Sequence, residues 1–151
     1  MIIARADSDA MDFKLLADEL ESELKIRDGE DYKELAQLNA IDGLPYIVLA
    51  YMGNNPVACG GLHPFKENEM EVKRMYVRPA YRGKGIATDI LKELEQWCSE
   101  LNVYSIALET GKNQPEAIAF YTKNNYQIIP NFGKYQNNKN SVCFRKVLKH
   151  R

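Results

Sequence analysis

A short run of glycines and basic residues in the middle of the chain could bind phosphate groups. The run Arg82-Gly83-Lys84-Gly85 lies between an expected β-strand, Met70 to Val77, and an expected helix, Ala87 to Leu101. Glycines at such a junction let the main chain approach a ligand closely. The first turn of a helix adds unpaired amide N–H groups and a partial positive charge, both of which attract anions. The sequence therefore predicts a phosphate site at this junction.

The charges around the glycines favour the same kind of ligand. Five basic residues and no acidic residue lie between Lys73 and Lys84, whereas the formal net charge of the whole chain is only -1. Because the excess of positive charge is local, it indicates a small anionic ligand rather than nucleic acid or an anionic membrane. The simpler alternative is a solvated charged edge, with the glycines serving a tight turn.

Two other phosphate-binding motifs fit this segment less well. A P-loop needs GxxxxGK followed by Ser or Thr, which the chain does not contain. The dinucleotide fingerprint GxGxxG is met at Gly83 and Gly85 but has Thr88 at its third glycine, with Glu109 roughly where a ribose-binding acid is expected. That motif follows the first strand of a βαβ unit, whereas this loop follows several strands that look antiparallel, so a dinucleotide is the weaker alternative.

The elements that must position this loop follow from the hydrophobic periodicity. We expect strands at Ile2 to Ala6, Pro45 to Met52, Val57 to Leu62, Met70 to Val77, Val103 to Leu108, Tyr126 to Ile129 and Ser141 to Leu148. We expect helices at Met11 to Ile26, Tyr32 to Leu38, Ala87 to Leu101 and Pro115 to Lys123. Three consecutive strands before the longest internal helix predict an α+β fold. Its sheet would be mixed and mostly antiparallel, with about six to seven strands flanked by about four helices.

Length and composition predict a single domain over residues 1–151. Hydrophobic residues make up 45% of the chain and charged residues 27%, which is typical of a globular protein. The N-terminal residues lack a signal-peptide pattern and no apolar run could span a membrane, so we expect a cytoplasmic protein. Cys59, Cys98 and Cys143 form no CxxC pair and are interpreted as buried small hydrophobes. No metal site is expected.

The glycine loop and its neighbours resemble the GCN5-related N-acetyltransferase (GNAT) superfamily, in particular its small bacterial members. The family's phosphate loop has Gln or Arg, two residues, Gly, one residue, then Gly or Ala, which matches Arg82, Gly85 and Ala87. Asn125 stands where the family has glycine, and Asn also tolerates the positive φ of a helix C-cap. Further similarity lies in Glu71 to Pro79, in Glu109-Thr110-Gly111, and in Asn113, Ala117, Phe120, Tyr121, Asn125 and Tyr126.

The resemblance implies acetyl-coenzyme A as cosubstrate and places it on this chain. Main-chain amides of the loop would hold the pyrophosphate, and the main chain of the preceding strand would bind the pantetheine arm like an added strand. Asn113 would contact the cofactor, although Asn113 followed by Gln114, Pro115 and Glu116 is also typical of a helix N-cap. The implied cofactor contacts are Met75, Tyr76, Val77, Arg82, Gly83, Lys84, Gly85, Ile86, Ala87, Thr88, Asn113 and Tyr121.

The resemblance also implies two catalytic residues. Tyr121 is the candidate general acid, because a phenol can protonate the departing thiolate. Glu71 is the candidate general base for the attacking amine, and ordered water is the alternative base. The simpler interpretations are an aromatic side chain packed beside Phe120 for Tyr121 and a surface carboxylate for Glu71.

Together these features predict an N-acetyltransferase that moves an acetyl group to a primary amine by direct attack on the thioester. The alternative is a non-catalytic acyl-coenzyme A-binding module or sensor on the same fold. The acceptor would be a small molecule or a protein amine, and polyamines, amino acids, aminoglycosides and protein N-termini or lysines all stay open. Neither nucleic acid nor a membrane is an expected partner, and a monomer and a homodimer both fit the sequence.

Overall fold

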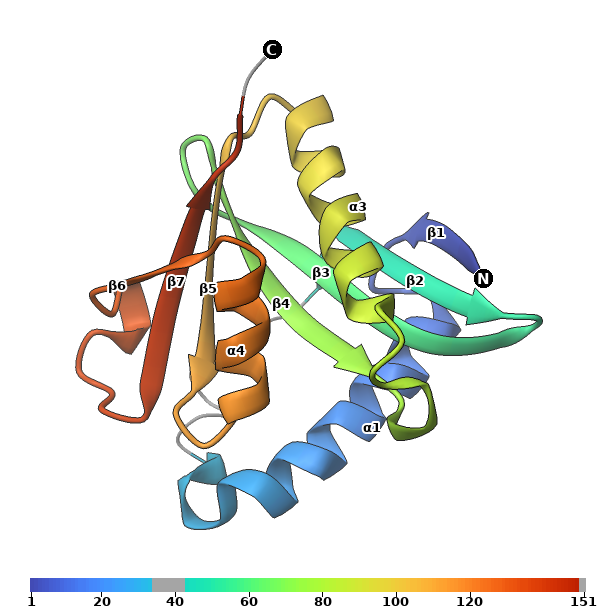
Figure 1. The fold of residues 1–151 in the computed structure, drawn as a ribbon, viewed down its shortest axis with the longest axis horizontal. Helices are drawn as coiled ribbons and strands as arrows, with labels where there is room; N and C mark the ends of the chain where they lie inside the picture. Colours follow the sequence, from blue (N-terminus) through green and yellow to red (C-terminus); the bar gives the residue numbers. More distant parts are fainter. Residues whose placement is uncertain (34–42, 150–151) are drawn as a thin grey trace.

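A seven-stranded sheet with helices on both faces makes up the structure, a computed structural model that describes residues 1–33 and 43–149 (Figure 1). The strand order is β1-β2-β3-β4-β5-β7-β6, and every neighbouring pair is antiparallel except the parallel pair β4 and β5. The strands are β1 (Ile2–Ala6), β2 (Tyr46–Met52), β3 (Asn55–Lys66), β4 (Glu69–Val77), β5 (Ser105–Gly111), β6 (Gln127–Ile129) and β7 (Ser141–Val147). The α-helices are α1 (Met11–Asp28), α3 (Ile86–Glu100) and α4 (Pro115–Lys123).

The predicted α+β architecture with a mixed, mostly antiparallel sheet is confirmed. The described residues contain three α-helices rather than about four, because the helix expected at Tyr32 to Leu38 falls mostly on residues 34–42, which lie outside the described ones. β3 runs to Lys66, past the predicted end at Leu62, because its polar end pairs with the start of β4. Asn68 makes the tight connection possible by adopting a φ of 65°.

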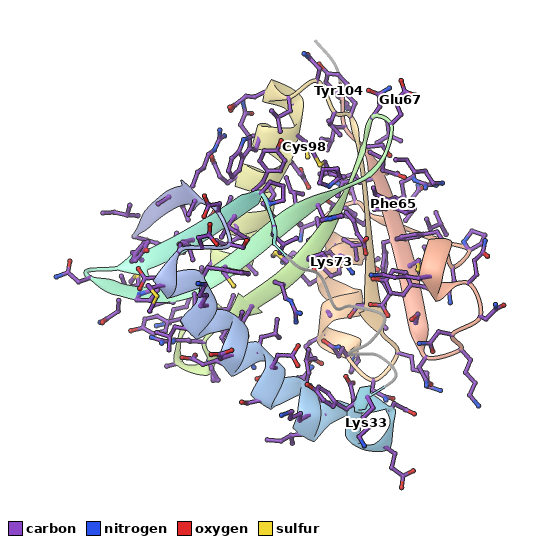
Figure 2. The ribbon with its side chains drawn as sticks, turned by 180° about the vertical axis from the view of Figure 1, so that it is seen from behind. Lys33, Phe65, Glu67, Lys73, Cys98 and Tyr104 are labelled. Carbon is purple, nitrogen blue, oxygen red and sulfur yellow. The ribbon has the colours of Figure 1, made fainter. Side chains whose placement is uncertain are left out.

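Apolar side chains from the two faces of the sheet form separate cores. α3 and α4 cover one face, and Figure 2, seen from behind, shows α1 in front of the other. Cys59, Cys98 and Cys143 are free thiols with no exposed surface, as predicted. None of the helices in residues 1–33 and 43–149 combines the length and apolar character needed to cross a membrane. The core under α3 and α4 includes Leu62, Val72, Ile90, Leu94, Tyr121 and Phe144, and the core under α1 includes Phe13, Leu16, Leu20, Ile47, Leu49 and Tyr76.

The parallel strands β4 and β5 separate halfway along their length. Their pairing runs from Glu69 and Ser105 to Val72 and Leu108 and then stops. β4 continues beside β3 to Val77, while β5 continues beside β7 to Gly111 (Figure 1). The edge of β4 that faces β5 therefore has no strand partner over residues 73–77, within the part of the chain that the structure describes.

A β-bulge in β4 accompanies this separation. Cys59 pairs with Tyr76 and Gly61 pairs with Lys73, so β4 has one more residue than β3 across this interval. Arg74 lies inside the interval and has a φ of 59°, in the left-handed region. An extra residue in one strand bends it and strengthens its twist. The bulge thus directs the second half of β4 away from β5.

Gly60 lies where β3 passes close under α3. A β-carbon there would lie 2.8 Å from Ile90 Cγ2 and would overlap the sulfur of Met75. We expect Gly60→Ala to lower the free energy of unfolding by about 1–3 kcal/mol, because overpacking forces neighbouring side chains out of their rotamers. Urea denaturation followed by circular dichroism would measure the change.

The matched control for this substitution is Gly111→Ala, another glycine within a strand. The nearest atom to a β-carbon at Gly111 is Gln114 Nε2 at 3.4 Å, which is close to an ordinary contact. We expect Gly111→Ala to shift the urea midpoint much less. Equal midpoints for the two variants would contradict close packing at Gly60.

Candidate functional site

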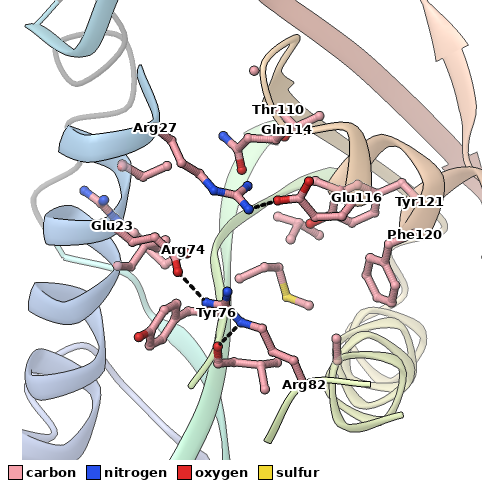
Figure 3. A pocket seen from close by; sticks show the side chains of 18 of the residues that line it. Glu23, Arg27, Arg74, Tyr76, Arg82, Thr110, Gln114, Glu116, Phe120 and Tyr121 are labelled. Carbon is pink, nitrogen blue, oxygen red and sulfur yellow. Dashed lines mark hydrogen bonds and ion pairs between the residues drawn. The ribbon is translucent and has the colours of Figure 1, made fainter. Parts of the chain in front are cut away.

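A cavity of about 600 Å³ opens where β4 and β5 separate. Figure 3 shows side chains from α1, β4 and α4 converging on it. The second half of α1, the second half of β4, the start of α3, the end of β5 and α4 all contribute to its lining. Of the residues predicted from the sequence, the lining includes Met75, Tyr76, Val77, Arg82, Gly83, Gly85, Ile86, Ala87, Thr88 and Tyr121.

The N-terminus of α3 supplies one end of this cavity. Gly85 is its N-cap with a φ of 80°, and it makes no side-chain cap hydrogen bond. The first amides of a helix have no acceptor within the helix itself. Because glycine has no side-chain oxygen to offer them, these amides remain available to a ligand or to water. A β-carbon at Gly83 or Gly85 would meet nothing within 4 Å, so the space beside the loop is open.

The arginines near the loop are paired with acidic side chains of α1. Arg74 Nη1 lies 2.6 Å from Glu21 Oε1, and Arg82 Nη2 lies 2.7 Å from Glu23 Oε1. These pairings correct the expectation of a local excess of positive charge, because α1 places carboxylates opposite three of the five basic residues. The N-terminus of α3 therefore remains a source of positive potential at this end that no side chain has to supply. The third pair is Arg78 with Glu19, whose Nη2 and Oε2 atoms lie 2.7 Å apart.

Tyr121 projects from α4 into the core that α4 and α3 form with the sheet. Its side chain is 6% exposed, and its ring centroid lies 5.1 Å from that of Phe120 and 5.8 Å from that of Tyr126. Among the described residues none hydrogen-bonds its hydroxyl group. Burial, and after it the negative charge of Glu109, raises the pKa of Tyr121, so the phenol is protonated at neutral pH.

Glu71 lies in a buried cluster on the opposite face of the sheet from Tyr121. It alternates along β4 with Val72, which packs in the α3 and α4 core, so its own side chain points to the α1 face. Its carboxylate lies 2.9 Å from Lys73 Nζ and accepts a hydrogen bond of 2.9 Å from the Tyr135 hydroxyl. Lys73 also donates a hydrogen bond to Tyr135, and burial lowers the pKa of Lys73.

Glu71 therefore does not line the cavity, but its partner Lys73 does. The two candidate catalytic residues face opposite sides of the sheet, and the opening between β4 and β5 is where those sides meet. Figure 2 labels Lys73 near the middle of the sheet.

Two other predicted residues lie outside the cavity lining. Lys84 and Asn113 are not among the lining residues. The predicted cap at Asn113 is wrong, because α4 has Gln114 as its N-cap and makes no side-chain cap hydrogen bond. Pro115 takes the first position of the helix, so the cap falls on the residue directly before it. Glu116 forms an ion pair with Arg27 of α1 instead of completing a capping box (Figure 3).

Asp28 is a cavity residue that the sequence did not indicate, since it lies beyond the predicted end of the first helix at Ile26. It is the last residue of α1 and is 7% exposed. Its Oδ1 atom has no hydrogen-bond partner among the described residues. Burial, followed by the charge of Asp31, raises the pKa of Asp28. No sequence pattern marks this residue, because its neighbour Gly111, at the end of β5, lies far away in the chain.

The sequence and the fold place this chain in a known family. Residues 13–126 match the profile of the acetyltransferase (GNAT) family. The chain therefore belongs to this family and is an N-acetyltransferase by class, which confirms the predicted resemblance.

Two curated relatives are similar over part of the chain. The IAA acetyltransferase of Azospirillum brasilense is 31% identical over 102 residues, which cover 67% of each chain. The uncharacterized N-acetyltransferase YjgM of Escherichia coli (strain K12) is 35% identical over 91 residues, or 58% of this chain and 54% of that one.

Solved structures are similar over nearly the whole chain. A proposed acyl-CoA N-acyltransferase from Klebsiella pneumoniae subsp. pneumoniae MGH 78578 has a TM-score of 0.80 and 27% identity, covering 98% of this chain and 97% of that one. The PaiA N-acetyltransferase of Thermoplasma acidophilum, solved in complex with coenzyme A, has a TM-score of 0.70 and 19% identity, covering 97% and 99%. At 19% identity, the similarity to the PaiA structure shows the shared fold alone.

Proposed function

We propose that residues 1–151 act as one domain that transfers the acetyl group of acetyl-coenzyme A to a primary amine. The observation that carries the proposal is the single cavity lining that joins an uncapped helix N-terminus, an unpaired strand edge and a buried phenol. Each of these matches one part of an acetyl thioester cofactor: its phosphates, its pantetheine amides and its sulfur.

The residues present fit coenzyme A by their donor chemistry. Amides from Arg82 to Thr88 would bind the pyrophosphate, since the start of a helix binds phosphate oxygens. The unpaired main chain of Met75 to Val77 would hydrogen-bond the pantetheine arm as an added strand does. Lys84 would take part through its main-chain amide. Asn113 receives no role in this proposal, because it does not line the cavity. The PaiA structure with coenzyme A supports a cofactor on the same fold.

The chain's own residues would then serve the transfer step. When bound, acetyl-coenzyme A supplies a thioester whose carbonyl carbon the amine attacks, so that a C–N bond forms and the C–S bond breaks. Tyr121 would give its hydroxyl proton to the departing sulfur. Burial raises the pKa of Tyr121. A thiol that forms beside it would have a raised pKa for the same reason, so proton transfer from the phenol to the departing thiolate remains feasible.

A proton must also leave the attacking amine. Lys73 lines the cavity and contacts Glu71, so Glu71 would act through Lys73: the amine's proton passes to Lys73 Nζ as Lys73 releases one of its own protons to the Glu71 carboxylate. Positioning of the amine and the thioester in one cavity would provide most of the rate gain.

Amine-dependent release of free thiol from acetyl-coenzyme A tests the proposal. The assay would follow thiol colorimetrically with a panel of primary amines, with a reaction lacking amine as the control. The protein's own cysteines are buried and would add no rapid background. We expect at least one amine to raise thiol release well above the control. Tight binding of acetyl-coenzyme A with no amine-dependent release across the panel would favour a non-catalytic binding module instead.

A further inference from the structure

A buried carboxylate with one unpartnered oxygen lies at the end of the cavity formed by the last turn of α1. Asp28 lines the cavity, is 7% exposed, and has no hydrogen-bond partner for Oδ1 among the described residues. A buried carboxylate oxygen without a partner is costly, because the protein does not replace the hydration that this oxygen loses. Such a group is retained at low cost only where a ligand supplies the missing partner.

The neighbouring positive charge does not fill this role. Arg27 precedes Asp28 in α1, but its guanidinium is directed across the cavity to Glu116 of α4 (Figure 3). The next residues after α1 add negative charge, since the turn that follows contains Glu30 and Asp31. The electrostatic environment of Asp28 therefore favours an incoming cation.

Polar groups from β5 and α4 lie beside Asp28. A β-carbon placed on Gly111 would lie 3.9 Å from Asp28 Oδ1 and 3.4 Å from Gln114 Nε2, so both side chains approach the same small space. Thr110 also lines the cavity at this end, and Figure 3 shows it beside Gln114. A carboxylate and a hydroxyl accept hydrogen bonds from an ammonium group, and the Gln114 amide can present its oxygen after it turns.

We propose that Asp28 binds a second positively charged nitrogen of the acceptor, so that the preferred acceptors are linear diamines or polyamines. The inference rests on the proposed acetyl transfer and adds the substrate class to it. The nitrogen at Asp28 is not the one that is acetylated, because a carboxylate stabilises an ammonium ion, and the reacting amine must be neutral when it attacks.

The position of Asp28 relative to the strand opening agrees with a long, narrow acceptor. The β4–β5 pairing ends at Leu108, and Gly111 lies three residues further along β5. At about 3.3 Å per residue this separates Gly111 from the opening by roughly 10 Å. The Arg27–Glu116 pair joins α1 to α4 at the same end and favours an unbranched chain.

Two amines of equal length provide the test. 1,5-Diaminopentane and 1-aminopentane present the same primary amine and differ in the second ammonium group. With the wild-type chain we expect kcat/KM for the diamine to exceed that for the monoamine by about tenfold or more, as for a hydrogen bond to a charged group. Asp28→Asn should bring this ratio close to one.

The matched control is Asp18→Asn, which removes the same charge from an exposed side chain of α1 that does not line the cavity. It should keep the wild-type ratio. Thermal melting would verify that Asp28→Asn folds, and the wild-type comparison tests the proposal without any variant.

The outcomes separate the two proposals. Thiol release from both amines with equal kcat/KM, or an unchanged ratio in Asp28→Asn, overturns the role of Asp28 and leaves acetyl transfer standing. Turnover of 1-aminopentane without turnover of 1,5-diaminopentane would also overturn the role of Asp28 and leave acetyl transfer standing. Absence of thiol release with every amine overturns the acetyl transfer on which this inference depends.

Discussion

Gly85→Val is expected to lower the affinity for acetyl-coenzyme A by about 100-fold or more, as estimated from the loss of two hydrogen bonds to a charged group. Gly85 is the N-cap of α3 with a φ of 80°, a conformation that a β-branched residue adopts only with strain. Either the loop keeps its shape and the valine side chain enters the open space beside it, or the loop changes and its amides turn away. Both results remove the phosphate site. Isothermal titration calorimetry would measure the dissociation constant.

Strain must be separated from the loss of the binding site in this experiment. Gly53→Val is the matched control, because Gly53 also has a positive φ, 61°, and open space around it, but lies in the turn between β2 and β3. Each variant should lose about 1–3 kcal/mol of stability from backbone strain. Only Gly85→Val should lose the cofactor. Unchanged calorimetric binding in Gly85→Val would disprove the phosphate site at α3.

Tyr121→Phe is expected to lower kcat by about 100-fold or more while leaving the affinity for acetyl-coenzyme A nearly unchanged. A positioned general acid typically contributes at least this factor. The hydroxyl group has no hydrogen-bond partner among the described residues, and the aromatic packing of the ring is retained in phenylalanine. The substitution therefore removes the proton and little else. Steady-state thiol release, combined with calorimetry of the cofactor, would measure both quantities.

Tyr126→Phe is the control for removing a buried phenol in the same core. The Tyr126 hydroxyl donates a hydrogen bond of 2.9 Å to Glu95, and Tyr126 does not line the cavity. Its loss should cost about 1.5–3 kcal/mol of stability, as for a hydrogen bond to a charged group, and should leave kcat close to the wild-type value. If Tyr121→Phe keeps its full turnover, Tyr121 is not the acid.

The sheet and its helices could be predicted because their apolar patterns are local. The run Tyr46–Met52 is continuously apolar and becomes a mostly buried interior strand, and Ile90, Leu94 and Cys98 mark one face of α3. Such periodicity depends only on neighbouring residues. The glycine loop could also be predicted, because two glycines precede a predicted helix in the sequence. Both glycines have a positive φ in the structure.

The remaining parts of the site depend on contacts that the sequence does not mark. The carboxylates that neutralise the arginines near the loop come from α1, more than fifty residues earlier in the chain. Tyr135 bonds Glu71 across 64 positions. Asp28 at the end of α1 lies beside Gly111 of β5, 83 residues further along the chain. The charges counted along the sequence therefore overestimated the positive potential at the loop. The burial of single polar residues could not be predicted from the sequence.

The bulge at Arg74 reverses the alternation of side chains along β4. Before it, Glu71 and Lys73 face the α1 side and Val72 faces the α3 side. In an uninterrupted strand Met75 and Val77 would follow Lys73, yet they pack toward α3, and Tyr76 packs under α1. Along β4 the side chains therefore follow two alternation frames, one before the bulge and one after it, and the second is shifted by one residue. The first frame buries a polar cluster, and the second presents an apolar wall to the cavity, with the change of frame at the point where β4 leaves β5.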